Sequence, residues 1–365
     1  MLKLDAGKVN VMLDGQFGST GKGLFAGYVA KHNKINIAMT NAAPNAGHTY
    51  CDEKGTKFTC FHLPVSGVLQ KDSLIYLCAG TIIDPAALAD EMDQLDVSWD
   101  RLRIHPRAAI IEKGDKIAEG AGSATEGLAS TQKGCGHALS RKINRSAMLA
   151  KDWYADQEFI QEVDLSAACA EGKTIFMEVP QGMDLSLNGG LSYPHCTSRE
   201  VSVSQALSDA CVHPFLLGKV AVTMRTFPIR VGHIYQKVHG YGNEKVGEKI
   251  VGNSGPFYPD QKELAWCDVG VTPELTTVTK RKRRIASWSW TQYRKCMDRF
   301  RPNYVFLNFC NYFRSEKDFE EHLNKMDEIR STKSAEFFTG FGPNVEDVYS
   351  PSETSLERLW FQENR

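Results

Sequence analysis

The sequence predicts an α/β fold in which a mostly parallel central sheet is flanked by helices and carries long functional loops. Short apolar segments rich in β-branched residues alternate with helical stretches along the chain, which is typical of parallel strands joined by crossover helices. A glycine-rich loop connects the first apolar segment to a helix, and loops at the carboxyl ends of parallel strands usually form the binding site. The chain has 365 residues, 42% of them hydrophobic. That is enough for a large buried core.

Seven segments are predicted to be parallel strands: Asn10–Leu13, Asn36–Met39, Leu74–Leu77, Leu102–Ile104, Thr174–Met177, Lys219–Thr223 and Tyr304–Asn308. One predicted helix begins after Asp84, with Pro85 at its first position, and runs to Gln94. Residues 120–136, 231–255 and 274–284 are rich in Gly, Ser or Thr, or in charge, and we expect loops there. We therefore predict a single catalytic domain over residues 1–365 with these three loop insertions.

Composition and charge narrow the class of protein. The chain has 43 basic and 44 acidic side chains, whereas a nucleic-acid binder usually carries a basic excess, so we expect no nucleic-acid partner. The ten cysteines show no metal-ligand spacing, which favours reduced thiols in a reducing compartment. No apolar run approaches about 18 residues, and the N-terminus does not resemble a signal peptide. We expect a cytoplasmic protein with no membrane partner.

The loop after the first predicted strand is the strongest functional signal. Glycines at positions 15, 18, 21 and 23 let the backbone turn its N–H groups toward an anion, and the following helix N-terminus adds positive dipole. Lys22 adds a full charge. The spacing differs from Walker A because five residues separate Gly15 from Gly21, and Gly23 stands where the magnesium-binding hydroxyl would be. We interpret the loop as a phosphate cradle rather than an incidental turn.

Two further polar segments suit nucleotide chemistry, each with a simpler alternative. His48 lies between Gly47 and Thr49 and could act as a general acid toward a phosphoryl oxygen, or it could be a polar surface residue. Residues 130–136 form a second polar, glycine-spaced loop, which is followed by cations that include Arg145. Hydroxyls with nearby guanidinium groups suit a second phosphate, and an exposed basic helix is the alternative.

Three later segments complete the list of candidates. Gln181 follows a predicted strand, and its amide could read a base edge or belong to a turn. The run 276–284 places threonines before five consecutive cations; we favour a clamp on small carboxylate or phosphate groups over polynucleotide binding. Asn308 and Asn311 end the last predicted strand, where guanine-nucleotide enzymes often place a base-reading motif.

Together, and in this order, these motifs resemble the adenylosuccinate synthetase family from about Val9 to Pro343. That family joins L-aspartate to carbon 6 of a 6-oxopurine nucleotide: a nucleoside triphosphate first phosphorylates O6, and the aspartate amine then displaces the phosphate. The resemblance implies Mg²⁺ as a cofactor. It also implies a homodimer in which Arg145 reaches across the interface.

The resemblance assigns roles to individual residues. The implied catalytic residues are Ser19, Lys22 and His48, and the implied Mg²⁺ ligands are Ser19 and the Gly47 carbonyl. The implied triphosphate site comprises Gly15, Gly18, Thr20, Gly21, Gly23, Thr49, Asn308, Asn311, Gly342 and Pro343. The implied monophosphate site comprises Ser19, Asn45, Ser130, Thr131, Arg145, Gln181, Cys196, Thr197 and Val231. The implied aspartate site comprises Val278, Thr279, Arg281 and Arg283.

One departure from the family pattern concerns the acceptor nucleotide. Ser19 and Thr20 stand where the family has Asp-Glu, and the missing aspartate is the family's general base for the N1 proton. A serine hydroxyl is neutral near pH 7 and is too weak a base to replace it directly. The serine pattern resembles a viral branch of the family that uses dGMP, whose guanine keeps N1–H and O6. We therefore predict dGMP as the acceptor, N6-succino-2-amino-dAMP as the product and, for a viral protein, the host cytoplasm. The group that deprotonates N1 stays open.

A second departure concerns the phosphoryl donor. Asn311 stands where guanine recognition uses a carboxylate. Losing a charged acceptor weakens guanine binding by about 1.5–3 kcal/mol per charge-assisted bond, so we predict ATP or dATP rather than GTP. The alternatives are an ordinary adenylosuccinate synthetase acting on IMP and GTP, or a P-loop-like switch or nucleic-acid binder that uses the basic run at 280–284.

Overall fold

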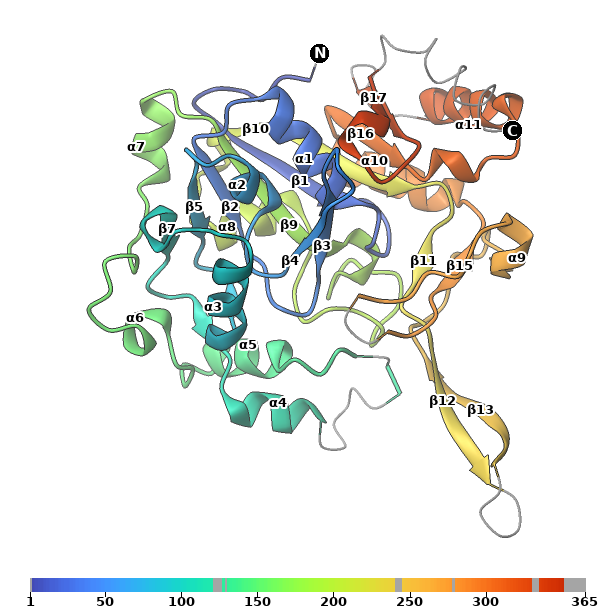
Figure 1. The fold of residues 1–365 in the computed structure, drawn as a ribbon, viewed down its shortest axis with the longest axis horizontal. Helices are drawn as coiled ribbons and strands as arrows, with labels where there is room; N and C mark the ends of the chain where they lie inside the picture. Colours follow the sequence, from blue (N-terminus) through green and yellow to red (C-terminus); the bar gives the residue numbers. More distant parts are fainter. Residues whose placement is uncertain are drawn as a thin grey trace.

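The computed structural model describes residues 2–120, 127–128, 130–239, 245–277, 280–329 and 335–350. A nine-stranded sheet forms its centre, with the strand order β18-β17-β16-β10-β1-β9-β2-β5-β7 (Figure 1). Every neighbouring pair in this sheet is parallel except β17 and β18. The predicted α/β class with a mostly parallel sheet is confirmed.

The strands of this sheet are β1 (Val9–Asp14), β2 (Ile37–Thr40), β5 (Leu74–Leu77), β7 (Leu102–Ile104), β9 (Ile175–Gly182), β10 (Leu217–Arg225), β16 (Tyr304–Asn308), β17 (Glu336–Gly340) and β18 (Val348–Tyr349). All seven predicted strands lie in it, and the two strands at one edge, β17 and β18, were not predicted. β9 and β10 are longer than expected because they run on to Gly182 and Arg225. These extensions carry polar residues toward the carboxyl edge of the sheet.

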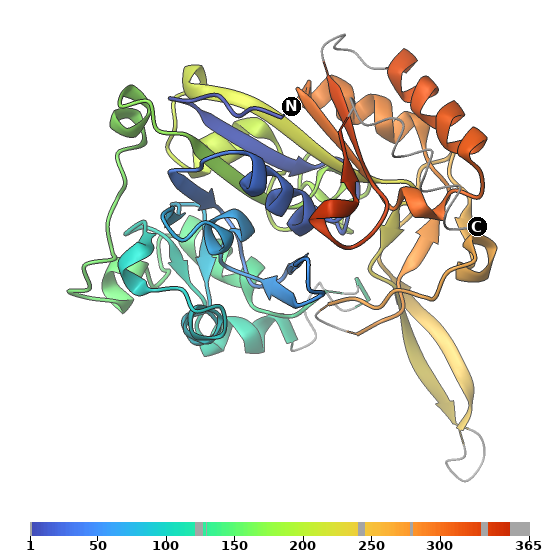
Figure 2. The same ribbon diagram turned by 45° about the horizontal axis from the view of Figure 1, so that its top comes forward.

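Helices cover both faces of the sheet, because successive side chains of a strand point to opposite faces. In β1, Val11 and Leu13 belong to one apolar core and Met12 belongs to the other. The first core is closed by α7 (Leu165–Ala170), α8 (Val203–Asp209), α10 (Trp290–Phe300) and α11 (Glu316–Ile329). The second is closed by α1 (Lys22–His32), α2 (Val65–Leu69) and α3 (Pro85–Gln94). Figure 2 shows the resulting layers.

The predicted helix boundary at Asp84 is confirmed. Asp84 is the N-cap of α3 and Pro85 is its first residue, a position where a missing backbone N–H costs nothing. The other helices are α4 (Lys113–Gly120), α5 (Cys135–Ile143), α6 (Ala150–Trp153) and α9 (Trp266–Val269). Within the part of the chain that the structure describes, no helix is both long and apolar enough to cross a membrane.

Smaller sheets surround the main one. The pairs are β3 (His48–Cys51) with β4 (Lys57–Cys60), and β6 (Ile82–Ile83) with β8 (Ala109–Ile110). A three-stranded sheet joins β11 (Ile229–Arg230), β15 (Arg284–Ala286) and β14 (Glu263–Leu264). Short 3₁₀ turns lie at Trp99–Arg101, Met183–Leu185, Pro214–Leu216, Cys310–Tyr312 and Val345–Asp347.

The expectation of a loop over 231–255 was wrong. The segment forms an antiparallel hairpin of β12 (His233–His239) and β13 (Lys245–Asn253), which projects from the body in both views (Figures 1 and 2). Its root is held by Arg230, whose guanidinium donates to the carbonyl oxygens of Ser254 (2.5 Å) and Pro256 (3.0 Å). A two-stranded ribbon that stands clear of the core needs no apolar face, so its polar composition resembles that of a loop.

The other two expected loops are described in part. Residues 130–134 have no regular structure before α5 begins at Cys135. In the segment 274–284, a β-bridge between Leu275 and Lys282 brings the two ends together.

Candidate active site

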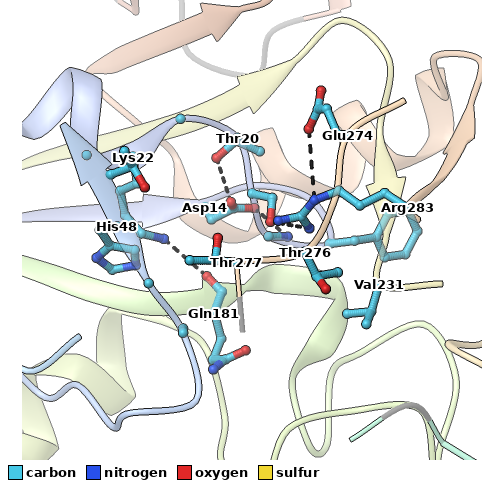
Figure 3. Close-up of a pocket in the computed structure, with 18 of the residues that line it drawn as sticks. Asp14, Thr20, Lys22, His48, Gln181, Val231, Glu274, Thr276, Thr277 and Arg283 are labelled. Atoms are coloured by element: carbon cyan, nitrogen blue, oxygen red, sulfur yellow. Dashed lines mark hydrogen bonds and ion pairs between the residues drawn. The ribbon is translucent and has the colours of Figure 1, made fainter. Parts of the chain in front are cut away.

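A cavity of about 440 Å³ lies at the carboxyl ends of the central strands (Figure 3). Its wall is built by the segments that follow β1, β2 and β16, by the end of β9, and by residues 274–277 with Arg283. Ligands of open α/β sheets bind at this edge, beside the strand where the connections change direction. Here that strand is β1, which lies between β9 and β10.

Many of the predicted site residues line this one cavity: Gly18, Ser19, Thr20, Gly21, Lys22, Gly23, Asn45, Gly47, His48, Thr49, Thr131, Gln181, Val231 and Arg283. Thr276 and Thr277, the first residues of the predicted carboxylate or phosphate clamp, also line it, whereas the sequence indicated no site role for the remaining lining residues: Asp14, Phe17, Ala46, Leu185, Glu274, Leu275 and Phe309. The phosphate cradle and part of the basic segment therefore face the same space, although more than 200 residues separate them in the sequence.

The carboxylate of Asp14 holds the glycine-rich loop through three hydrogen bonds. Its Oδ1 accepts hydrogen bonds from the backbone N–H groups of Gln16 (2.9 Å) and Gly18 (3.1 Å), and its Oδ2 accepts from Thr20 Oγ1 (2.5 Å). The carboxylate is 1% exposed. These bonds stabilise a turn in which Ser19 adopts a left-handed backbone with φ of 57°, a conformation that L-residues seldom adopt.

Gly21 is required by close packing as well as by backbone geometry. It has φ of 86°, and a Cβ added there would lie 1.9 Å from Nδ2 of Asn308. Asn308 in turn donates from Nδ2 to the Thr20 carbonyl oxygen (3.3 Å). The loop therefore rests directly on the end of β16.

Lys22, at the start of α1, reaches across the cavity to β9. Its Nζ donates to the carbonyl oxygen of Gln181 (3.3 Å), and the side-chain amide of Gln181 donates to Asn45 Oδ1 (3.1 Å). Burial lowers the pKa of Lys22, while the charges of Asp14 and Glu178 oppose this shift. These hydrogen bonds thus connect the start of α1, the end of β9 and the segment that follows β2.

His48 is a half-buried residue at the start of β3. Burial and the neighbouring charge of Lys22 lower its pKa to about 3. The imidazole is therefore neutral at pH 7, and one ring N–H is available to donate a hydrogen bond to a phosphoryl oxygen in the cavity.

The far wall of the cavity is cationic. Arg283 donates from Nη1 to Ser19 Oγ (2.8 Å). Burial lowers the pKa of Arg283 to about 10, partly against the charge of Glu274, so the group stays a cation at neutral pH. Glu274 pairs with Arg225, and the guanidinium of Arg225 lies 3.8 Å from the centre of the Phe309 ring. This wall could hold a small carboxylate.

Comparison with known proteins identifies the family. A sequence model of the adenylosuccinate synthetase family matches residues 11–168. The chain is 35% identical to an N6-succino-2-amino-2'-deoxyadenylate synthase of Salmonella phage PMBT28, over 93% of this chain and 97% of that protein. It is also 32% identical to an adenylosuccinate synthetase of Archaeoglobus fulgidus, over 76% of each chain.

The chain belongs to the adenylosuccinate synthetase family.

A solved structure agrees with this assignment to the adenylosuccinate synthetase family. The succinoaminodeoxyadenylate synthetase of cyanophage S-2L, bound to dGMP and to dATP as an energy donor, superposes with a TM-score of 0.81 at 32% identity. The match covers 97% of this chain and 99% of that chain. The fold is therefore shared along nearly the whole length.

Five residues of the predicted triphosphate site of this adenylosuccinate synthetase family member do not line the cavity. Gly15, Asn308, Asn311, Gly342 and Pro343 lie at the ends of β1, β16 and β17. Because β16 and β17 are paired neighbours, four of these five residues gather at one edge, beside the phosphate cradle. Their role in binding the donor base stays a prediction.

The remaining predicted residues are more dispersed. Ser130 is the neighbour of Thr131, which lines the cavity. Thr197 donates its backbone N–H to the carbonyl oxygen of Leu185 (2.7 Å), a cavity-lining residue, so residues 196–197 lie behind the cavity wall. Arg281 lies on the basic segment but does not line the cavity. Arg145 is exposed just after α5. Val278 and Thr279 lie outside the described residues.

Proposed function

We propose that this protein joins L-aspartate to carbon 6 of dGMP through a 6-phosphoryl intermediate and releases N6-succino-2-amino-dAMP. The observation that carries the proposal is the convergence of Lys22, His48, Gln181 and Arg283 on one cavity whose phosphate loop presents Ser19. The phage relatives named for this product, which match along nearly the full chain, support it further. We also propose that the chain acts as a single catalytic domain with loop insertions, in the cytoplasm or, for a viral protein, the host cytoplasm.

The residues around Lys22 suit phosphoryl transfer to O6. Lys22 and the loop amides place positive charge where the transferred group would lie, and such preorganised charge stabilises the transition state. His48, neutral and held near Lys22, would donate its N–H to the same group. Asn45 and Thr131 flank the space where the dGMP phosphate would bind, and Gln181 would read the guanine edge.

The cationic wall suits L-aspartate. Arg283 lies at the cavity with its guanidinium within hydrogen-bond distance of Ser19 Oγ, so a carboxylate bound to Arg283 would lie beside the phosphate loop. Aspartate bound in this way would have its amine directed toward the carbon that carries the activated oxygen. Arg281, Val278 and Thr279 remain proposed members of the aspartate site.

The chain supplies oxygen donors that fit Mg²⁺. Ser19 and Gly47 both line the cavity, and they would offer a hydroxyl and a carbonyl oxygen. Magnesium usually takes few protein ligands and completes its shell with phosphate oxygens and water. Over the described residues no cluster of three or more Asp, Glu, His or Cys is arranged around a metal position, as this sparse mode expects. Mg²⁺ bound there with nucleotide phosphates would neutralise charge on the transferred phosphoryl group.

We propose dATP or ATP as the donor. The cyanophage structure was solved with dATP as an energy donor, and Asn311 offers an amide where a guanine reader would need a carboxylate.

We further propose a homodimer in which Arg145 reaches the partner's site. Arg145 is exposed, and the side chain of the nearby Ile143 is 72% exposed. Residues that a partner subunit covers in a dimer are exposed in this way in an isolated protomer.

The test pairs each acceptor with each donor. Purified protein is incubated with L-aspartate, Mg²⁺ and every combination of dGMP, GMP or IMP with dATP, ATP or GTP, and the succinyl-nucleotide is measured by mass spectrometry. We expect product from dGMP with dATP or ATP. Product from IMP and GTP alone would establish the ordinary adenylosuccinate synthetase reaction instead. Absence of product from every pair would contradict the ligase function.

A further inference from the structure

One carboxylate, that of Glu274, lies between two arginines at the cavity wall. Arg225 donates to it from Nη2 to Oε1 (2.5 Å) and from Nη1 to Oε2 (3.1 Å). Arg283 also approaches this carboxylate, with its Nε 3.9 Å from Oε2 (Figure 3). Tyr312 adds a hydroxyl bond to Oε1 (3.2 Å). Glu274 thus holds two cations that would otherwise repel each other.

Both arginines also contact the same residue of the phosphate loop. Arg225 donates from Nη1 to the backbone carbonyl oxygen of Ser19 (3.1 Å), and Arg283 donates from Nη1 to Ser19 Oγ (2.8 Å). The segment that begins at Glu274 and the loop after β1 are therefore connected through Ser19. This connection passes through side chains whose geometry depends on Glu274.

Burial makes Glu274 the counterion that Arg225 requires. Arg225 is 0% exposed, and its Nε has no hydrogen-bond partner, so water cannot compensate its charge if the carboxylate is lost. A buried ion left without its partner is strongly unfavourable. The side chain of Glu274 itself is 25% exposed and reaches the cavity.

The same contacts make Glu274 a weaker base than a free carboxylate. Burial on its own raises the pKa of Glu274, but the charges of Arg225 and Arg283, together with hydrogen bonds from Arg225 and Tyr312, outweigh it, and the net shift is downward. A carboxylate with a lowered pKa is a poor proton acceptor near neutral pH. The role that its geometry favours is to hold the two arginines.

We propose that Glu274 is a positioning residue that couples the aspartate site to the phosphoryl-transfer loop. It holds Arg283 toward the cavity for the substrate carboxylate, and with Arg225 it holds Ser19 in its left-handed turn. This inference rests on the proposed function for its kinetic consequence. Its structural consequence, order in the loop, does not depend on which substrate is used.

The kinetic test compares two glutamates that each pair with an arginine of the same basic segment. Glu274→Gln removes the charge between Arg225 and Arg283, whereas the control Glu263→Gln removes the partner of Arg284, outside the cavity wall. We expect Glu274→Gln to raise the KM for aspartate about tenfold or more while the KM for dGMP changes little. Glu263→Gln should change neither. An unchanged or lowered KM for aspartate in Glu274→Gln overturns the proposal.

A second variant separates positioning from folding. Glu274→Gln leaves Arg225 buried without a counterion, so the double variant Arg225→Gln with Glu274→Gln removes both charges and leaves two neutral amides, the one at 225 shorter than the guanidinium that it replaces. The double variant should regain part of the melting temperature that Glu274→Gln loses and still show the raised KM for aspartate. Recovery of both quantities would mean that Glu274 serves folding alone, and would overturn the positioning role.

An activity-independent measurement keeps this inference distinct from the proposed function. Amide hydrogen exchange of the ligand-free protein should become faster over residues 15–23 in Glu274→Gln than in the wild type or in Glu263→Gln, because the arginine contacts to Ser19 loosen. Unchanged exchange there overturns the inference even if the ligase reaction is observed. Faster exchange supports it even if the wild type proves to use another acceptor.

Discussion

The guanidinium of Arg283 donates a hydrogen bond of 2.8 Å to the hydroxyl of Ser19. In the family pattern that Ser19 departs from, this position carries an aspartate. A carboxylate there would form a full ion pair with Arg283, whereas a hydroxyl accepts one bond and adds no negative charge beside the cation. The exchange at this one position would therefore alter both the proposed acceptor site and the proposed aspartate site.

Replacing His48 by Ala should abolish turnover and leave the fold intact. The side chain lines the cavity beside Lys22, and loss of one hydrogen-bond donor to charge that develops in the transition state costs about 10²–10³-fold in rate. Steady-state kcat with dGMP, aspartate and dATP measures the loss, and circular dichroism checks the fold. Rates like those of the wild type would remove His48 from the mechanism.

The depressed pKa of His48 predicts a pH dependence of stability. Its pKa falls from 6.5 to about 3 in the folded protein, mainly through burial and then through Lys22. As the pH drops below 6.5, the unfolded chain takes up a proton at this residue before the folded protein does, so stability is lost between pH 6.5 and about 3. His48→Gln should lose less stability than the wild type between pH 7 and pH 5. Urea unfolding of both proteins at the two pH values measures this, and equal losses would contradict the shift.

Gly21→Ala should impair both stability and donor binding. The new Cβ would meet Asn308 Nδ2 at 1.9 Å, and the backbone has φ of 86°, so a cost of about 1–3 kcal/mol is expected from strain alone. Thermal melting and the KM for dATP are the measurements. Gly55→Ala is a matched control, because Gly55 also has positive φ but its Cβ would meet nothing within 4 Å. A donor KM in Gly21→Ala that stays as low as in Gly55→Ala would show that the loop tolerates the methyl group.

Ser19→Ala should raise the Mg²⁺ concentration needed for half-maximal activity. The substitution removes one of the proposed oxygen ligands and the acceptor of the Arg283 bond, while the Gly47 carbonyl remains. Titration of Mg²⁺ at saturating nucleotides measures the effect, and chelation with EDTA should abolish activity in both proteins. An unchanged Mg²⁺ requirement in Ser19→Ala would exclude Ser19 as a ligand.

The sheet and the phosphate loop were predictable from local sequence. A strand such as β1, covered on both faces, forms a nearly continuous apolar run. The glycines and Lys22 that follow it occur in an order that is typical of a phosphate-binding loop. The projecting β12–β13 hairpin was not predictable by the same logic, because an exposed ribbon has no buried face that would impose an alternating pattern.

The acidic residues of the site were missed for a different reason. Asp14 and Glu274 are single carboxylates whose roles appear only through distant partners. Asp14 acts on the loop through Thr20, which lies 2.6 Å from the hydroxyl of Thr223 on β10, and Glu274 acts through Arg225. No local spacing signals such pairs. The basic segment is conspicuous in the sequence because its charges are consecutive, whereas Glu274, which approaches Arg283, is an isolated acidic residue.

The packing of Asn308 has a consequence for how nucleotide choice can change in evolution. The amide is wedged between Gly21 and Gly340, each of which would collide with it if it carried a Cβ. A larger side chain at 308 would push the phosphate cradle itself out of shape. If Asn311 and Pro343 contact the donor base as proposed, selection for a different donor base would act on such positions, where a new side chain can change base preference without deforming the loop.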